Sequence, residues 1–78
     1  MFLEIITPDK KLFSGEVKSI VLPGTDGKFG ILNHHAPIIS SLKKGTVKVT
    51  DTVEKTQNFE IKGGVVEMLN NQVIILAE

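Results

Sequence analysis

The sequence predicts an all-β fold, a small antiparallel β-sandwich or flattened barrel of about eight to ten short strands. No segment of about ten residues repeats its apolar side chains with the helical period, and glycine or proline interrupts most candidate helices. Short runs of β-branched and other apolar residues recur about every 8 to 12 residues, as in sandwiches and barrels. We expect residues 1–78 to form a single domain, near the lower size limit of independent folding.

The first 22 residues predict two strands joined by a turn. Residues 2–7, FLEIIT, are rich in β-branched and aromatic types and end at Pro8, which is typical of a strand. Thr7-Pro8-Asp9-Lys10 predicts a turn, because proline presets φ and aspartate can bond the backbone two residues on. A second strand follows at Lys11–Leu22, with a bulge or bend expected at Ser14-Gly15.

The stretch from Leu22 to Leu42 holds three glycines and two prolines between two apolar runs. Glycine supplies positive φ and proline locks φ, so this composition predicts a loop of fixed path from Pro23 to Pro37. A short strand is expected at Phe29–Leu32, where Phe29 and Leu32 would anchor the loop. The apolar side chains of this stretch either fill the core or form an interaction patch at one end of the sandwich.

The second half predicts further short strands separated by turns. A turn at Lys43-Lys44-Gly45 separates two of them, and Val47 and Val49 point inward from the second. Residues 51–58 predict a polar hairpin loop, and Gly63-Gly64 interrupts the strand pattern that follows. Asparagine tolerates left-handed φ, so Asn70-Asn71 predicts a primed hairpin turn. The closing run QVIILA, at 72–77, is nearly all apolar and predicts a strand covered on both faces.

The composition argues against several classes of function. Nine basic and nine acidic residues cancel, whereas nucleic-acid binding needs a clustered positive face. The chain has no cysteine, which excludes disulfides and thiolate metal sites. No apolar run approaches the roughly 20 residues that span a bilayer, so we expect no direct membrane insertion. A mean hydropathy of +0.13 is high for a small domain and indicates that a partner covers part of it.

The candidate sites for chemistry are weak. His34 and His35 are adjacent, point to opposite faces of an extended chain and have no third ligand at a recognisable spacing. Ser40-Ser41 lies in no nucleophile signature. The glycines at 24, 27 and 30 follow G-x-x-G-x-x-G with no helix after them, so the phosphate-binding fingerprint is not met. We therefore predict no catalytic residue, no metal and no cofactor.

Several short motifs, taken together and in order, resemble the ε subunit of bacterial F-type ATP synthases, specifically its N-terminal β-sandwich domain. They cover nearly the whole chain: Phe13-Ser14-Gly15, Gly27-Lys28-Phe29-Gly30-Ile31-Leu32, His35-Ala36-Pro37, Lys44-Gly45, Gly63-Gly64-Val65-Val66-Glu67 and Val73-Ile74-Ile75-Leu76-Ala77-Glu78. The resemblance implies a non-catalytic rotor subunit that clamps the γ subunit to the ring of c subunits and so couples ion flow to ATP synthesis. It implies a peripheral location, through the complex, on the cytoplasmic face of the bacterial inner membrane.

The resemblance also implies which residues make these contacts. The loop facing the c-ring and γ would consist of Lys28, Phe29, Gly30, Leu32, His34, His35, Ala36 and Pro37. A flank facing γ would include Thr7 and Ser40.

The sequence departs from the family pattern at two places. Members often carry an acidic residue at the position of Lys28, so a retained contact with the ring would have its charge reversed. Most bacterial relatives continue into a C-terminal helical hairpin, whereas this sequence ends at Glu78, and we expect a subunit that couples without inhibiting through that hairpin.

A β-sandwich module that binds carbohydrate or another ligand is the alternative function, although the chain lacks the Trp and Tyr that stack on sugars. A small hydrolase is a weaker alternative, since no acid/base pair stands at a meaningful spacing.

Overall fold

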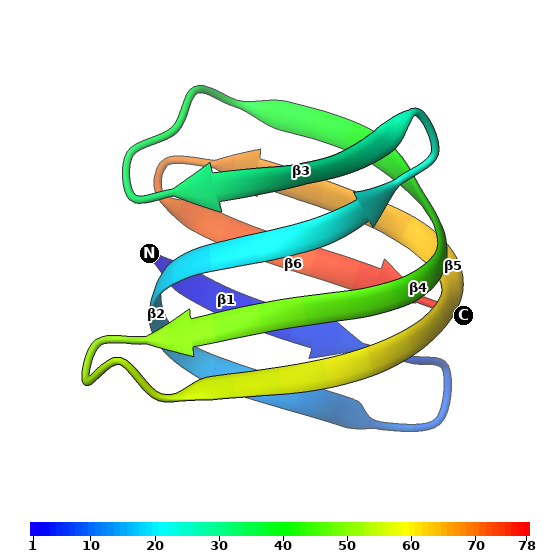
Figure 1. The fold of residues 1–78 in the computed structure, drawn as a ribbon, viewed down its shortest axis with the longest axis horizontal. Coiled ribbons are helices and arrows are strands. Elements are labelled where there is room, and N and C mark those ends of the chain that lie inside the picture. Colours follow the sequence, from blue (N-terminus) through cyan, green and yellow to red (C-terminus); the bar gives the residue numbers. More distant parts are fainter.

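The computed structural model describes residues 1–78 and contains only β-strands and their connections (Figure 1). The six strands are β1 (Phe2–Ile6), β2 (Lys11–Gly24), β3 (Gly27–Leu32), β4 (Ile38–Asp51), β5 (Thr56–Leu69) and β6 (Gln72–Ala77). The all-β prediction is confirmed. The predicted number of strands is wrong, because three of the six strands are 14 residues long. No helix is present that could cross a membrane.

The long strands arise because two predicted interruptions are bends and not turns. The turn expected at Lys43-Lys44-Gly45 does not form, and β4 pairs with β5 without a register shift from Ile38–Met68 to Thr50–Thr56. Gly63 and Gly64 lie in the middle of β5 with φ of 148° and 149°. Glycine adopts this backbone conformation without a steric penalty, so β5 curves together with β4 around the molecule (Figure 1).

The sheet closes on itself. Its strand order is β1-β6-β5-β4-β2-β3, and a further pairing of β1 with β2 completes a barrel of five strands, with β3 attached to β2 alone. All pairings are antiparallel except that of β1 with β6, which is parallel. The prediction of an antiparallel sheet is therefore wrong at this one pair, where the first and last strands meet.

The interior is a single apolar cluster of 16 buried residues with no buried polar side chain. Val47 and Val49 point into it, as predicted. The bulge predicted at Ser14-Gly15 is misplaced, because the register of β2 with β4 shifts between Val17 and Ser19. Val17 and Ile20 are both fully buried, three positions apart, which strict alternation cannot produce.

Two of the predicted tight turns, at Thr7–Lys10 and Asn70-Asn71, are confirmed. Asn70 and Asn71 have φ of 51° and 59°, as a primed hairpin turn requires. In the turn at Thr7–Lys10, the backbone N–H of Thr7 donates to the Lys10 carbonyl at 2.8 Å. The Thr7 hydroxyl, and not the Asp9 carboxylate, accepts the turn's backbone N–H groups. The hairpin between β4 and β5 is shorter than predicted, because β5 already begins at Thr56.

Candidate interaction surfaces

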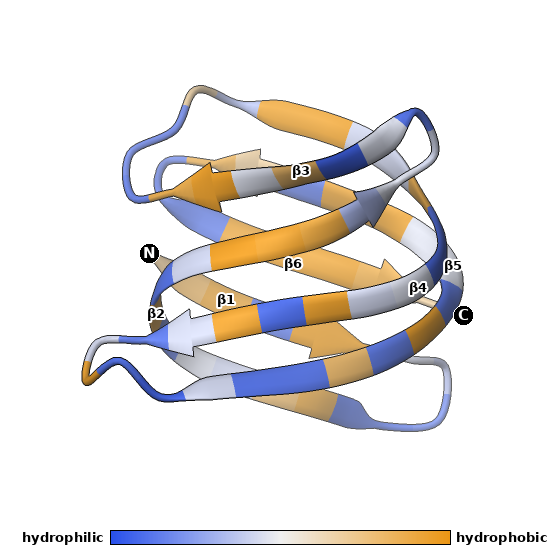
Figure 2. Cartoon of the chain, in the orientation of Figure 1, coloured by the Kyte–Doolittle hydropathy of each residue, from blue (hydrophilic) through white to orange (hydrophobic).

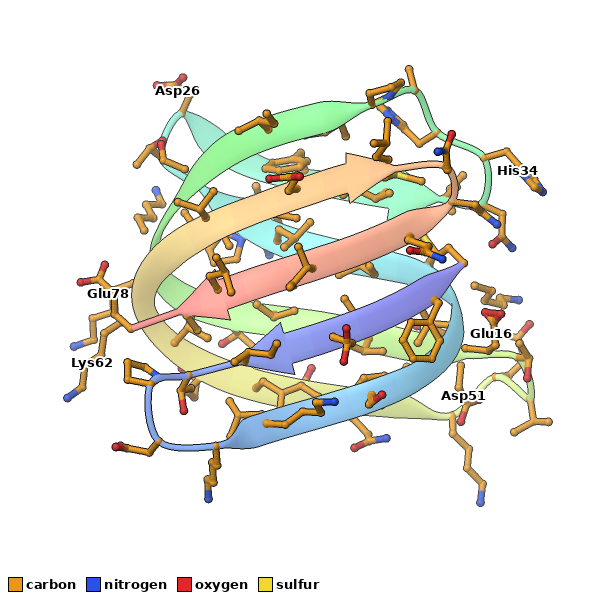
Figure 3. The ribbon with its side chains drawn as sticks, turned by 180° about the vertical axis from the view of Figure 1, so that it is seen from behind. Glu16, Asp26, His34, Asp51, Lys62 and Glu78 are labelled. Atoms are coloured by element: carbon orange, nitrogen blue, oxygen red, sulfur yellow. The ribbon has the colours of Figure 1, made fainter.

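The residues from Pro23 to Pro37 do not form one loop. β2 continues to Gly24, a tight turn at 25–26 follows, and β3 pairs with β2 from Gly27 to Leu32. Only residues 33–37 are irregular. The turn carrying Asp26 and the loop carrying His34 lie at opposite ends of β3 (Figure 3). Lys28 belongs to the Asp26 end, so the structure separates it from the His34 to Pro37 group along the length of a strand.

β3 is held to the barrel by apolar anchors that differ from the predicted pair. Ile31 is fully buried, and Phe29 is half-buried and packs against the core. Leu32 is 66% exposed and anchors nothing. The reason is alternation along β3, which turns Phe29 and Ile31 inward and leaves Lys28, Gly30 and Leu32 facing out. The outward side chains of β3 thus run into the exposed loop that follows.

The loop at 33–37 is fixed by hydrogen bonds to its surroundings. The His34 N–H donates to Asn71 Oδ1 at 2.7 Å, which ties the loop to the turn between β5 and β6. The His35 N–H donates to the Leu32 carbonyl at 3.2 Å, and its ring Nδ1–H donates to the Ala36 carbonyl at 2.8 Å. His34 itself has φ of 62°. Ala36 and Pro37 in the same loop are exposed. The hydrogen bonds therefore hold these two exposed residues in a defined position.

The side chains that could suggest a catalytic or metal site are not gathered into one. No three His, Asp or Glu side chains are grouped so that they could hold a metal ion. Asp51 Oδ1 accepts the backbone N–H groups of Val53 and Lys55, both at 2.9 Å, and so serves its own hairpin. The Ser41 hydroxyl hydrogen-bonds the Thr25 hydroxyl at 2.7 Å.

A second surface, which the sequence reasoning missed, is the outer face of β1, β6 and β5. In register across these strands lie Ile6, Leu76 and Val65 in one row, and Ile74 beside Glu67 in the next. We call this surface the outer apolar face; its apolar members are Phe2, Ile6, Val65, Leu69, Ile74 and Leu76. Leu76 is 52% exposed, Leu69 54% and Val65 41%. Figure 2 shows the hydrophobic colouring along β6.

A signal for this face was present in the sequence. The run QVIILA predicted a strand covered on both faces, but only Val73, Ile75 and Ala77 are buried by the chain itself. The prediction of double coverage is therefore wrong within this chain. The apolar side chains of Ile74 and Leu76 point outward, where no other part of this chain covers them. The run is therefore more apolar than burial within this chain requires.

Of the two predicted flank residues, only Thr7 lies beside this face. Thr7 directly follows β1 and lines a shallow depression with Ile6 and Leu76. Ser40 lies on β4 opposite Val66, with its side chain toward the half-buried inner side. Ser40 therefore does not share the outer apolar face with Thr7, and the structure places the two residues apart.

Comparison with known proteins gives a consistent assignment. The family model described as ATP synthase, Delta/Epsilon chain, beta-sandwich domain matches residues 1–78. The ATP synthase epsilon chain of Chlorobium limicola is 43% identical over 76 residues, covering 97% of this chain and 86% of that protein. The ATP synthase epsilon chain of Leptospira borgpetersenii is 41% identical over 76 residues, and this chain spans 59% of its length.

Two solved structures share the fold. A chain of the Euglena gracilis mitochondrial ATP synthase (OSCP/F1/c-ring) superposes with a TM-score of 0.90 at 23% identity, covering 96% of this chain and 48% of its own. A chain of the Tetrahymena thermophila mitochondrial ATP synthase (central stalk and c-ring) superposes with a TM-score of 0.82 at 19% identity, covering 99% and 62%. With the family model matched along all 78 residues, the chain belongs to the ATP synthase delta/epsilon family, as its β-sandwich domain.

Proposed function

We propose that this chain is a non-catalytic subunit of the central stalk of an F-type ATP synthase, clamping γ to the c-ring and coupling ion flow to ATP synthesis. The observation that carries the proposal is the family match over residues 1–78, together with bacterial relatives named ATP synthase epsilon chain. The complex would hold the chain peripherally at the cytoplasmic face of the bacterial inner membrane. The proposal assigns it no catalytic residue, metal or cofactor.

We assign the contact with the c-ring and the foot of γ to the rim formed by β3 and the loop after it. This rim comprises Lys28, Phe29, Gly30, Leu32, His34, His35, Ala36 and Pro37. Its outward residues on β3 are exposed and lead directly into the exposed loop. The rim contains both ends of β3, so Lys28 and the loop at 33–37 would meet different parts of the partner surface.

We assign the main contact with γ to the outer apolar face, with Thr7 at its border, and we keep Ser40 on β4 as a separate predicted contact with γ. The support is its composition, since half-exposed Val65, Leu69 and Leu76 gain free energy when a partner removes them from water. A face of adjacent strands is also stiff, because each strand of the barrel is hydrogen-bonded to a neighbour on both sides. A clamp that transmits torque requires such stiffness, since a compliant contact would absorb the torque as deformation.

The test is removal of this subunit from the bacterial enzyme, followed by restoration with the wild-type chain. Membrane vesicles lacking it should lose ATP synthesis driven by an ion gradient, through uncoupling or release of the catalytic head. Restoration should recover both synthesis and ATP-driven ion pumping. Vesicles that keep full coupled synthesis without the subunit would overturn the proposal. A restored chain that binds sugar and leaves coupling unchanged would favour the alternative binding module.

A further inference from the structure

Two acidic residues stand within the outer apolar face, Glu4 on β1 and Glu67 on β5. Glu67 is exposed on β5, and its register partners on the two neighbouring strands are Ile39 on β4 and Ile74 on β6. Ile39 is 77% exposed, so an apolar side chain accompanies the carboxylate on either side. Glu67 also lines a shallow depression whose other walls include Phe2, Leu69 and Ile74.

Glu67 has no ion-pair partner, whereas the carboxylates of Glu4, Glu16 and Glu54 do. The Glu4 carboxylate, on the far side of Ile74 on β1, is 2.8 Å from Lys11 Nζ. Glu54 is paired with Lys18, and Glu16 lies 3.5 Å from the N-terminal ammonium group. The ammonium group of Lys11 is thus already engaged by Glu4. In the free chain, water hydrates the Glu67 carboxylate and no partner is needed.

Docking of an apolar partner would remove that water. Desolvation of an unpaired carboxylate opposes association strongly, and a cation with hydrogen-bond donors on the partner offsets it most fully. An arginine or lysine suits this position, because its aliphatic stem packs on apolar surface while its charged head reaches the carboxylate. We propose that the surface of γ that covers the outer apolar face is itself apolar and presents one basic side chain to Glu67. This proposal rests on the proposed function, which makes γ the occupant.

A second copy of this chain does not fit the same face. Two copies meeting there would bring Glu4 and Glu67 of one chain toward the same carboxylates of the other. Lys11, the basic residue that pairs with a carboxylate of this face, already contacts Glu4. Charge complementarity therefore selects a different chain that carries positive charge.

The experiment measures the dissociation constant between this subunit and a complex of α, β and γ subunits that lacks it, at low and high salt. Variants Glu67→Gln and Glu67→Lys are compared with Glu60→Gln, which removes a charge from an exposed residue of the same strand beyond the bend at Gly63-Gly64. At low salt we expect about tenfold weaker binding for Glu67→Gln and more than about hundredfold weaker binding for Glu67→Lys. Glu60→Gln should bind like the wild type.

Salt provides a second readout. Wild-type binding should weaken as salt rises, and Glu67→Gln should lose part of that dependence, because the screened pair is gone. Equal affinity and equal salt dependence of the wild type and Glu67→Gln would overturn the proposal while leaving the proposed function intact. If the wild-type chain itself fails to bind the complex, the proposed function fails. A dimer of this chain that forms through the outer apolar face would also overturn the inference.

Discussion

The backbone of Gly24, at the end of β2, lies directly against the ring of Phe29 on β3. A Cβ atom at position 24 would stand 2.7 Å from Phe29 Cε1 and 2.7 Å from the Gly27 carbonyl oxygen. Real Cβ contacts are not this short, so one of the two strands would have to move. This contact allows the Phe29 ring to pack against the core and keeps β3 close to the barrel.

Gly24→Ala is therefore expected to destabilise the fold by about 1–3 kcal/mol, the usual cost of forcing a methyl group into a packed site. Gly30→Ala is the matched control on the same hairpin, because its Cβ would meet nothing closer than the Ile20 carbonyl at 3.6 Å. Urea unfolding followed by circular dichroism measures both. Equal stability of the two variants would show that the Gly24–Phe29 contact does not constrain β3.

Substitutions at two neighbouring residues of β6 should distinguish an effect on stability from an effect on binding. Ile75 is fully buried, so Ile75→Ala should cost about 2–5 kcal/mol of stability. Leu76 is 52% exposed, so Leu76→Ala should cost less than about 1 kcal/mol. Leu76→Ala should nevertheless weaken binding to the complex of α, β and γ about tenfold, because Leu76 belongs to the outer apolar face. Val53→Ala, at an exposed loop residue, is the binding control, and an equal loss there would contradict the assignment.

The hydrogen bond between the His34 N–H and Asn71 predicts a local effect on the loop at 33–37. Asn71→Gly keeps the primed turn, since glycine accepts its φ, but it removes the Oδ1 acceptor. The His34 amide should then exchange with solvent about tenfold faster, corresponding to one lost hydrogen bond. Asn70→Gly keeps that bond and should leave the His34 amide unchanged. Hydrogen exchange read by NMR distinguishes the two variants, and identical exchange at His34 would contradict the expectation.

Lys28 tests the proposed contact with the c-ring. Lys28 stands where the family often has an acidic residue, so a retained contact would have reversed charge, with an acidic or carbonyl-rich surface on the ring side. We therefore expect Lys28→Glu to weaken assembly of the subunit into the rotor about two- to fivefold at low salt, where screening is weakest. Lys48→Glu makes the same charge change at an exposed position of β4 and should have no effect. Reconstituted vesicles assayed for ATP-driven ion pumping provide the measurement. Unchanged assembly and coupling in Lys28→Glu would remove the ring contact from the proposal.

Much of the fold was predictable because alternation and turn chemistry are local. The Val47 and Val49 pattern and the Asn70-Asn71 turn are encoded within a few residues each. The number of strands was not predictable, because Gly63-Gly64 is compatible with both an interruption and a bend, and only pairing with β4 decides between them. Parallel pairing of β1 with β6 likewise depends on contacts between the two ends of the chain.

The candidate surfaces were likewise predictable where a local pattern determines them, and not where strand pairing does. The unusual composition around Pro37 pointed to the loop at 33–37, but placing Lys28 at the other end of β3 required the hairpin register. The outer apolar face escaped prediction because a nearly continuous apolar strand does not reveal whether its own chain or another covers its second side. The isolation of Glu67 depends on register with β4 and β6, which no local pattern contains.

The parallel pairing of β1 with β6 also has a consequence for biosynthesis. β1 leaves the ribosome before the rest of the barrel, yet one of its two strand neighbours comes from residues 72–77. Until that segment emerges, the nascent chain carries unpaired edges on β1 and β5, which are prone to join other chains. The barrel can close only after nearly all of these residues have been translated, so early contact with a chaperone would protect it during synthesis.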